Sequence, residues 1–197
     1  MILGNRLNLK KISETVGKVP VVYGKKLRVM FQGEARFGRI NDPRRCWAPK
    51  SKRPIAPCQV VREFTYAYAA ASPSDGVMDS LILPFVNTEM MSLFLEEVGR
   101  RHKDEFVLMF LDGAGWHRSK SLKIPVNMKI ERLPPYSPEL NPIEHIWEEI
   151  REKWFANEAF KSMKFVEDQL ETALFQLEND KEKVRHITGF DWILTSI

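Results

Sequence analysis

Two short apolar runs constrain the possible fold of this chain more than any other feature. One is followed by an aspartate and the other by two prolines, residues that end a strand. Residues 106–111 read FVLMFL and end at Asp112, and residues 128–133 end before two prolines. A strand that is apolar throughout is typical of the buried centre of a sheet. We therefore expect both runs to be strands, with the first in the middle of the sheet and Asp112 at its carboxyl end.

A helix is predicted soon after the second run. Asn141 is a good N-cap, Pro142 suits the first helical position, and Glu144 then falls in the first turn. Mg²⁺ typically takes one or two carboxylates plus water and substrate phosphate. Asp112 and Glu144 therefore predict a divalent-metal site. Two local alternatives stay open, because Glu144 could be the partner of Asn141 in a capping box and Asp112-Gly113 could be a simple turn.

The other elements are predicted from the same kind of pattern. Three earlier stretches are rich in β-branched and aromatic residues and read as strands joined by antiparallel hairpins: 27–32, 58–71 and 77–85. A helix is expected from Asn87 or Thr88 to about Arg101, and a last helix over roughly 162–178. The chain is thus expected to be α/β, with a mixed five-stranded sheet of three antiparallel strands followed by two parallel ones, flanked by helices.

Composition limits the class of protein. With 197 residues, 44% hydrophobic and 28% charged, the chain suits one domain with a real core. We expect residues 1–25 to be a poorly patterned lead-in and 26–197 to form the domain. No apolar stretch approaches the length of a membrane span, and Cys46 and Cys58 are not spaced like a metal knuckle. A cytoplasmic protein with reduced cysteines is expected.

The basic charge is concentrated near the N-terminus. Residues 1–62 hold 15 Lys/Arg and 3 Asp/Glu, a balance that suits contact with nucleic-acid phosphates. A Pro-rich segment after the first strand contains Trp47, which we expect to be a buried or stacking anchor. Its basic residues are predicted to contact the DNA backbone, with a merely solvated basic loop as the alternative: Arg44, Arg45, Lys50, Lys52 and Arg53.

Three stretches together resemble a known family. FQGEARFGRINDPRRCWAPKSKRP, LDGAGWHRSK and LPPYSPELNPIEHIWEEIREKW look like the catalytic domain of DDE transposases, in the bacterial insertion-sequence branch of the mariner superfamily. The resemblance covers about residues 26–194. It implies a ribonuclease-H-like fold, two Mg²⁺ or Mn²⁺ ions, and cleavage and rejoining of DNA strands, with transposon ends and target DNA as partners. The family's second acidic position falls on Asp112 and its third on Glu144.

The family's first acidic position falls on Gly33, where this chain departs from the pattern. Asp112 and Glu144 supply two negative charges against the four positive charges of two ions, so the resemblance implies a weakened site. Glu34 is adjacent, but neighbours on a strand point to opposite faces. It could substitute only through a bulge or a register shift, and a glycine would favour a bulge. His117 is interpreted as a local hydrogen-bonding residue rather than a ligand.

We therefore expect transposase-type DNA strand cleavage and strand transfer by two-metal phosphoryl transfer, truncated at the front and impaired at the first ligand. The alternative is a catalytically inactive remnant that serves as a DNA-binding or interaction domain, and a plain ribonuclease-H-like nuclease is a third hypothesis. The sequence leaves open whether the chain is an active enzyme, which target it uses, and whether a separate N-terminal DNA-binding part exists. A homodimer is allowed, and the oligomeric state also stays open.

Overall fold

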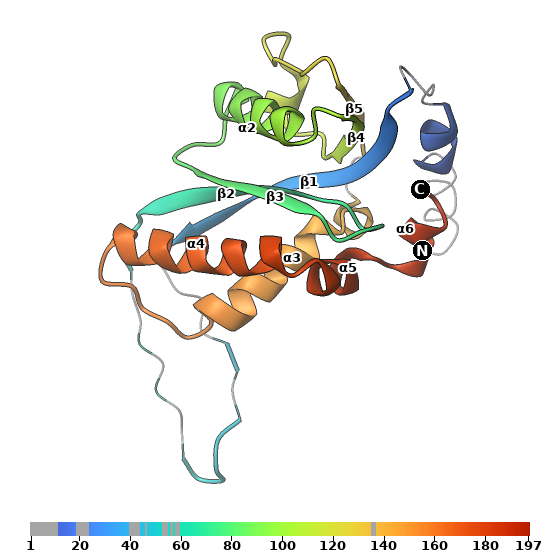
Figure 1. Ribbon diagram of the computed structural model, residues 1–197. Helices are drawn as coiled ribbons and strands as arrows, with labels where there is room; N and C mark the ends of the chain where they lie inside the picture. Colours follow the sequence, from blue (N-terminus) through green and yellow to red (C-terminus); the bar gives the residue numbers. More distant parts are fainter. Residues whose placement is uncertain are drawn as a thin grey trace.

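One five-stranded sheet organises the protein (Figure 1). The computed structural model describes residues 12–18, 24–39, 44–45, 47–52, 55, 57, 60–134 and 137–197. The strand order is β3-β2-β1-β4-β5, with β1, β2 and β3 paired antiparallel and β1, β4 and β5 paired parallel. This confirms the predicted α/β sheet. The strands are β1 Lys26–Gly38, β2 Phe64–Ala71, β3 Met78–Leu83, β4 Glu105–Leu111 and β5 Met128–Arg132.

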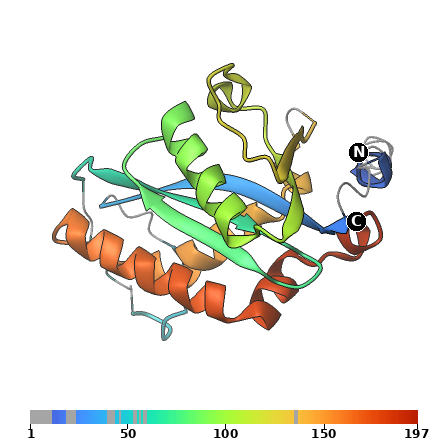
Figure 2. The ribbon, with the colours of Figure 1, turned by 45° about the horizontal axis from the view of Figure 1, so that its top comes forward.

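Helices cover both faces of the sheet (Figures 1 and 2). One face is covered by α2, Thr88–Arg101, and the other by α3, Ile143–Ile150, with α4, Met163–Asn179. Asn87 caps α2 by accepting a hydrogen bond from the Met90 amide at 2.8 Å, as the sequence predicted. The remaining short elements are η2 Gly115–Arg118, η3 Pro138–Leu140, η4 Arg151–Phe155, α5 Lys181–Thr188 and α6 Asp191–Leu194.

Several predicted boundaries were wrong. The second strand begins at Phe64 rather than at residue 58, because its pairing with β1 begins where Phe64 meets Gly38. For the same reason β1 continues past Gln32 to Gly38, an extension that the sequence left open as either strand or turn. After α4 the chain forms two more helices, since Asp180 accepts a hydrogen bond from the Lys183 amide and starts α5. Within the predicted lead-in, residues 12–18 are helical, and Ile12 packs into the core.

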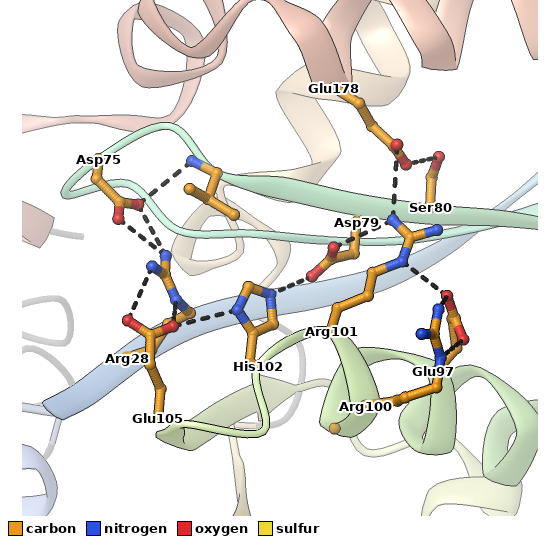
Figure 3. Close-up of polar contacts among 12 residues, drawn as sticks. Arg28, Asp75, Asp79, Ser80, Glu97, Arg100, Arg101, His102, Glu105 and Glu178 are labelled. Carbon is orange, nitrogen blue, oxygen red and sulfur yellow. Dashed lines mark hydrogen bonds and ion pairs between the residues drawn. The ribbon is translucent and has the colours of Figure 1, made fainter. Parts of the chain in front are cut away.

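A cluster of charged side chains joins α2 to the sheet at the end opposite the carboxyl terminus of β4 (Figure 3). Arg28 pairs with Asp75 at 2.9 Å and also with Glu105. The His102 ring lies between Asp79, 2.6 Å from Nε2, and Glu105, 3.1 Å from Nδ1. Each of these carboxylates has a basic partner, so the cluster forms ion pairs that hold the end of α2 against the sheet. Within the described residues, no helix is long and apolar enough to span a membrane.

Candidate active site at the carboxyl end of β4

The start of α3 is anchored beside the middle of β1, and this brings Glu144 to the end of β4. Asn141, directly before α3, donates a hydrogen bond from Nδ2 to the Gln32 carbonyl oxygen at 2.9 Å. β1 lies next to β4 in parallel register, with Phe31 opposite Phe110. Asp112 follows β4 immediately, and Glu144 lies in the first turn of α3. Two predicted site residues thus come from elements that meet at one edge of the sheet.

The carboxylates around Glu144 interact electrostatically. Burial raises the pKa of Glu144, the Arg151 guanidinium opposes this, and the nearby carboxylates of Asp112, Glu148 and Glu34 raise it further. Like charges that raise a pKa in this way favour the binding of a cation, which relieves their repulsion. In a capping box the Glu144 side chain would accept a hydrogen bond from the backbone amide of Asn141. That amide instead donates to the Pro138 carbonyl oxygen, so the capping-box alternative was wrong.

Asp112 is held by two donors at the end of β4. Its Oδ1 accepts hydrogen bonds from the Ala114 amide and from His117 Nδ1, both at 2.9 Å. The hydrogen bond from His117 lowers the pKa of Asp112, burial opposes that change, and the Ala114 amide lowers the pKa further. The bond to Ala114 is the local turn that the sequence left open as an alternative. The turn does not prevent Asp112 from binding a metal, since its carboxylate stays ionised and largely exposed.

His117 connects Asp112 to Glu34. Its Nε2 donates to Glu34 Oε1 at 2.9 Å, and Trp116 Nε1 donates to the same oxygen at 3.1 Å. Burial lowers the pKa of His117, but its hydrogen bonds to Asp112 and Glu34 outweigh this and raise the pKa to about 9. The imidazole therefore keeps both protons at neutral pH. Sequence reasoning treated His117 as a local residue and missed this bridge, and the only signal was its position five residues after Asp112.

Gly33 packs closely against α3. A Cβ on Gly33 would lie 2.6 Å from Ile143 Cγ2 and 3.4 Å from Trp147 Nε1. The register between β1 and β2 is unbroken from Phe31 to Gly38, so β1 forms no bulge there. Glu34 stays on the opposite face, with His117. No bulge therefore turns Glu34 toward the α3 face, and among the described residues the His117 imidazole is what connects Glu34 to Asp112.

The basic segment between β1 and β2 extends away from the sheet where it is described (Figure 1). Arg44 lies near η4, because its backbone amide donates to Asn157 Oδ1 at 2.9 Å and its Nε lies 3.3 Å from Glu152 Oε1. The side chain of Trp47 is fully exposed, so it is not a buried anchor, and a stacking role stays a prediction. Three other predicted contacts are exposed, namely Arg45, Lys50 and Lys52. Arg53 and both cysteines lie outside the described residues.

Comparison with known proteins places these features in a family. Residues 28–167 match the family described as DDE superfamily endonuclease. The chain belongs to this family. Over 130 residues it is 35% identical to the uncharacterized protein y4pE/y4sA of Sinorhizobium fredii (strain NBRC 101917 / NGR234), an overlap of 66% of this chain and 96% of that protein. The family resemblance expected from the motifs around Gly33, Asp112 and Glu144 is confirmed.

Solved transposase structures share the fold of this DDE endonuclease. The Mos1 mariner paired end complex with Mn aligns with a TM-score of 0.59 and 16% identity, over 96% of this chain and 61% of that chain. The catalytic domain of Mos1 mariner transposase aligns with a TM-score of 0.51 and 16% identity, over 92% of both chains. The chain thus spans about three fifths of the Mos1 protein in the complex. The expected ribonuclease-H-like fold is confirmed.

Proposed function

We propose that this DDE endonuclease is a transposase-type catalytic domain that cleaves and joins DNA strands by phosphoryl transfer, with a weakened metal site. The observation that carries the proposal is the placement of Asp112 directly after β4 and of Glu144 in the first turn of α3, which Asn141 anchors beside β1. The similar Mos1 structures include a strand transfer complex and a paired-end complex with a transposon end. Transposon ends and target DNA are the corresponding substrates here.

The two carboxylates fit one Mg²⁺ or Mn²⁺ ion. Both are oxygen donors of the kind that hard cations prefer, and their mutual repulsion is relieved by a positive charge. Two of the similar Mos1 complexes contain Mn and Mg. The described residues contain no cluster of three or more His, Cys, Asp or Glu side chains able to hold a metal. Such an ion, when bound, neutralises charge on the reacting phosphate.

The chain's own residues orient the site. His117 donates to Asp112 and keeps that carboxylate ionised and fixed at the end of β4. Glu34 holds the imidazole from the other side. Glu144 must lose its proton to act as a ligand, and its raised pKa makes this harder in the absence of a cation. The nucleophile in this chemistry is water or a DNA 3′ hydroxyl, so no side chain forms a covalent intermediate.

A second candidate function is a catalytically inactive remnant that binds DNA or another protein. The packing at Gly33 favours it, because Ile143 Cγ2 occupies the space that a side chain at this position would need. A site that lacks its first carboxylate and has closed over the gap holds two ions poorly. Both functions keep the fold and the contact with DNA, and they differ only in whether strands are cut.

A plasmid-nicking assay with Mg²⁺ or Mn²⁺ separates the two functions. The wild-type protein is compared with Asp112→Asn and with Asp104→Asn, a matched loss of charge at an exposed position in the turn before β4. Nicking that Asp112→Asn abolishes and Asp104→Asn preserves would establish an enzyme. Nicking only after Gly33→Asp would establish the remnant. Nicking that survives Asp112→Asn would overturn the assignment of the site.

DNA binding by the basic segment is part of the same proposal. Arg45, Lys50 and Lys52 are exposed on a segment that extends from the sheet, and exposed cations of this kind contact phosphates. Arg44 and Arg53 complete the predicted set. Affinity for duplex DNA should therefore fall steeply with added salt, because each phosphate contact releases counterions. A flat response in a titration would count against this part of the proposal.

A further inference from the structure

The outer half of β1 extends past the end of β4, where β1 stays paired with β2 on its other side. β1 pairs with β4 only as far as Phe31, whereas its pairing with β2 continues to Gly38. Side chains alternate along a strand, so Glu34 and Arg36 share one face with Gly38. Glu34 already reaches the candidate site through His117. Arg36 is the next residue outward on that face.

A hollow of about 510 Å³ lies on this outer part of the sheet, and its lining is basic and aromatic. It is lined by Arg36, Gly38, Arg62 and Phe64. The guanidinium carbon of Arg36 lies 4.4 Å from the centroid of the Phe64 ring, a cation–π contact that holds the guanidinium at the wall. Gly38 keeps the hollow open, because a Cβ there would come within 2.5 Å of Phe64 Cδ1.

The two arginines of the hollow carry uncompensated charge. Among the described residues, neither Arg36 nor Arg62 forms an ion pair with a carboxylate, whereas the neighbouring Arg39 pairs with Glu63 at 2.8 Å. Both guanidinium groups are exposed. The planar fork of a guanidinium matches the oxygens of a phosphate in a bidentate manner. Two such groups on one hollow make an anion site with the geometry for a phosphodiester.

We propose that Arg36 and Arg62, with the Phe64 ring beneath Arg36, form a subsite for a backbone phosphate of the DNA substrate. This inference rests on the proposed function, because it takes DNA as the ligand. Arg36 lies two residues beyond Glu34 on the same face of β1, about 7 Å along the strand, so the subsite would hold the DNA backbone next to the His117–Glu34 side of the candidate site.

The test measures how salt affects DNA affinity, by fluorescence anisotropy with a short labelled duplex. For Arg36→Gln combined with Arg62→Gln, the slope of log K against log salt should become less steep by about two, equally for unrelated sequences. The matched control is Arg100→Gln combined with Arg185→Gln, which removes two exposed arginines from α2 and α5. The control should keep the wild-type slope. The charge-preserving pair Arg36→Lys and Arg62→Lys should restore most of it.

The outcomes distinguish the subsite from the proposed function. A steep wild-type slope that the Arg36/Arg62 pair leaves unchanged would overturn the subsite while DNA binding stands. An equal loss in the control pair would also overturn it, since bulk charge would then explain the effect. No salt-dependent binding by the wild-type protein would remove the proposed function, and the subsite with it. Equal urea midpoints for all variants confirm that each one folds, as expected for exposed side chains.

Discussion

Substitution of Gly33 tests whether this position is a former metal-ligand position that the side chain of Ile143 now fills. Gly33 lies in regular β1 backbone with no positive φ, so only packing opposes a side chain. The added Cβ would lie 2.6 Å from Ile143 Cγ2, against about 3.5–4.0 Å for an ordinary carbon contact. Overpacking costs about 1–3 kcal/mol, and replacing a strand glycine returns about 0.5–1 kcal/mol. Gly33→Ala should therefore lower the free energy of unfolding by about 1–2 kcal/mol.

Ile143→Leu should remove this conflict. Leucine lacks the Cγ2 methyl but conserves volume, and such swaps usually cost less than about 1.5 kcal/mol. In that background Gly33→Ala should no longer destabilise, which gives a coupling energy of about 1–2 kcal/mol in a double-mutant cycle. An aspartate at position 33 also gains a partner, because Trp147 Nε1 is buried, lies 3.4 Å from the added Cβ and has no hydrogen-bond partner among the described residues.

Urea unfolding with and without Mg²⁺ is the assay, followed by tryptophan fluorescence. Gly33→Asp in the Ile143→Leu background should restore the third carboxylate, and Mg²⁺ at 100 times its Kd should then stabilise it by about 2.7 kcal/mol. Gly33→Asn in the same background has the same size without the charge and is the control. An equal Mg²⁺ response in both would show that position 33 is not a ligand position. A fully stable Gly33→Ala in the wild-type background would show that the packing is not tight.

Three further predictions follow from the same structure. His117→Asn leaves Glu34 buried without its cation and should lower the free energy of unfolding by about 3 kcal/mol in urea; a loss below about 0.5 kcal/mol would contradict this. The hydrogen bond from Arg28 lowers the pKa of Glu105 in the folded protein. The stability that the Arg28–Glu105 pair contributes is therefore present above the pKa of Glu105 in the unfolded chain, and it is lost as the pH falls through the lower pKa of the folded protein. The melting temperature of Arg28→Met should therefore fall less between pH 5 and pH 3 than that of the wild type. Trp47→Ala should leave the urea midpoint unchanged, because the ring is exposed, but weaken DNA binding in anisotropy if it stacks on a base.

The pH dependence at His117 has the opposite sign to that of the carboxylates. Its pKa of about 9 in the folded protein lies above the ordinary value of about 6.5. The stability it contributes is therefore fully present below about pH 6.5 and is lost as pH rises through about 9. Melting temperatures of the metal-free protein and of His117→Asn should converge between pH 6.5 and pH 10. Parallel curves over that range would contradict the bridge between Glu34 and Asp112.

Much of the fold was predictable because its signals are local. The apolar spacing in α2 and its Asn87 cap fixed that helix within a residue of the predicted limits. The run that became β4 was expected from six consecutive apolar residues. The start of β2 was missed and the end of β1 stayed open, because the length of a strand depends on where its partner stops pairing. Burial of Trp47 was one of two alternatives and proved wrong, since residue type alone does not show whether other side chains cover an aromatic ring in a basic loop.

Residue type and spacing over a few residues were enough to predict the five strands, the helices α2, α3 and α4, and the family resemblance that singles out Asp112, Glu144 and Gly33. The contacts around those three positions came only from the folded arrangement. The contact between His117 and Glu34 joins residues 83 apart, and that between Asn141 and Gln32 joins residues 109 apart. Such contacts depend on strand register and on the approach of α3 to β1, and no local pattern encodes either of them.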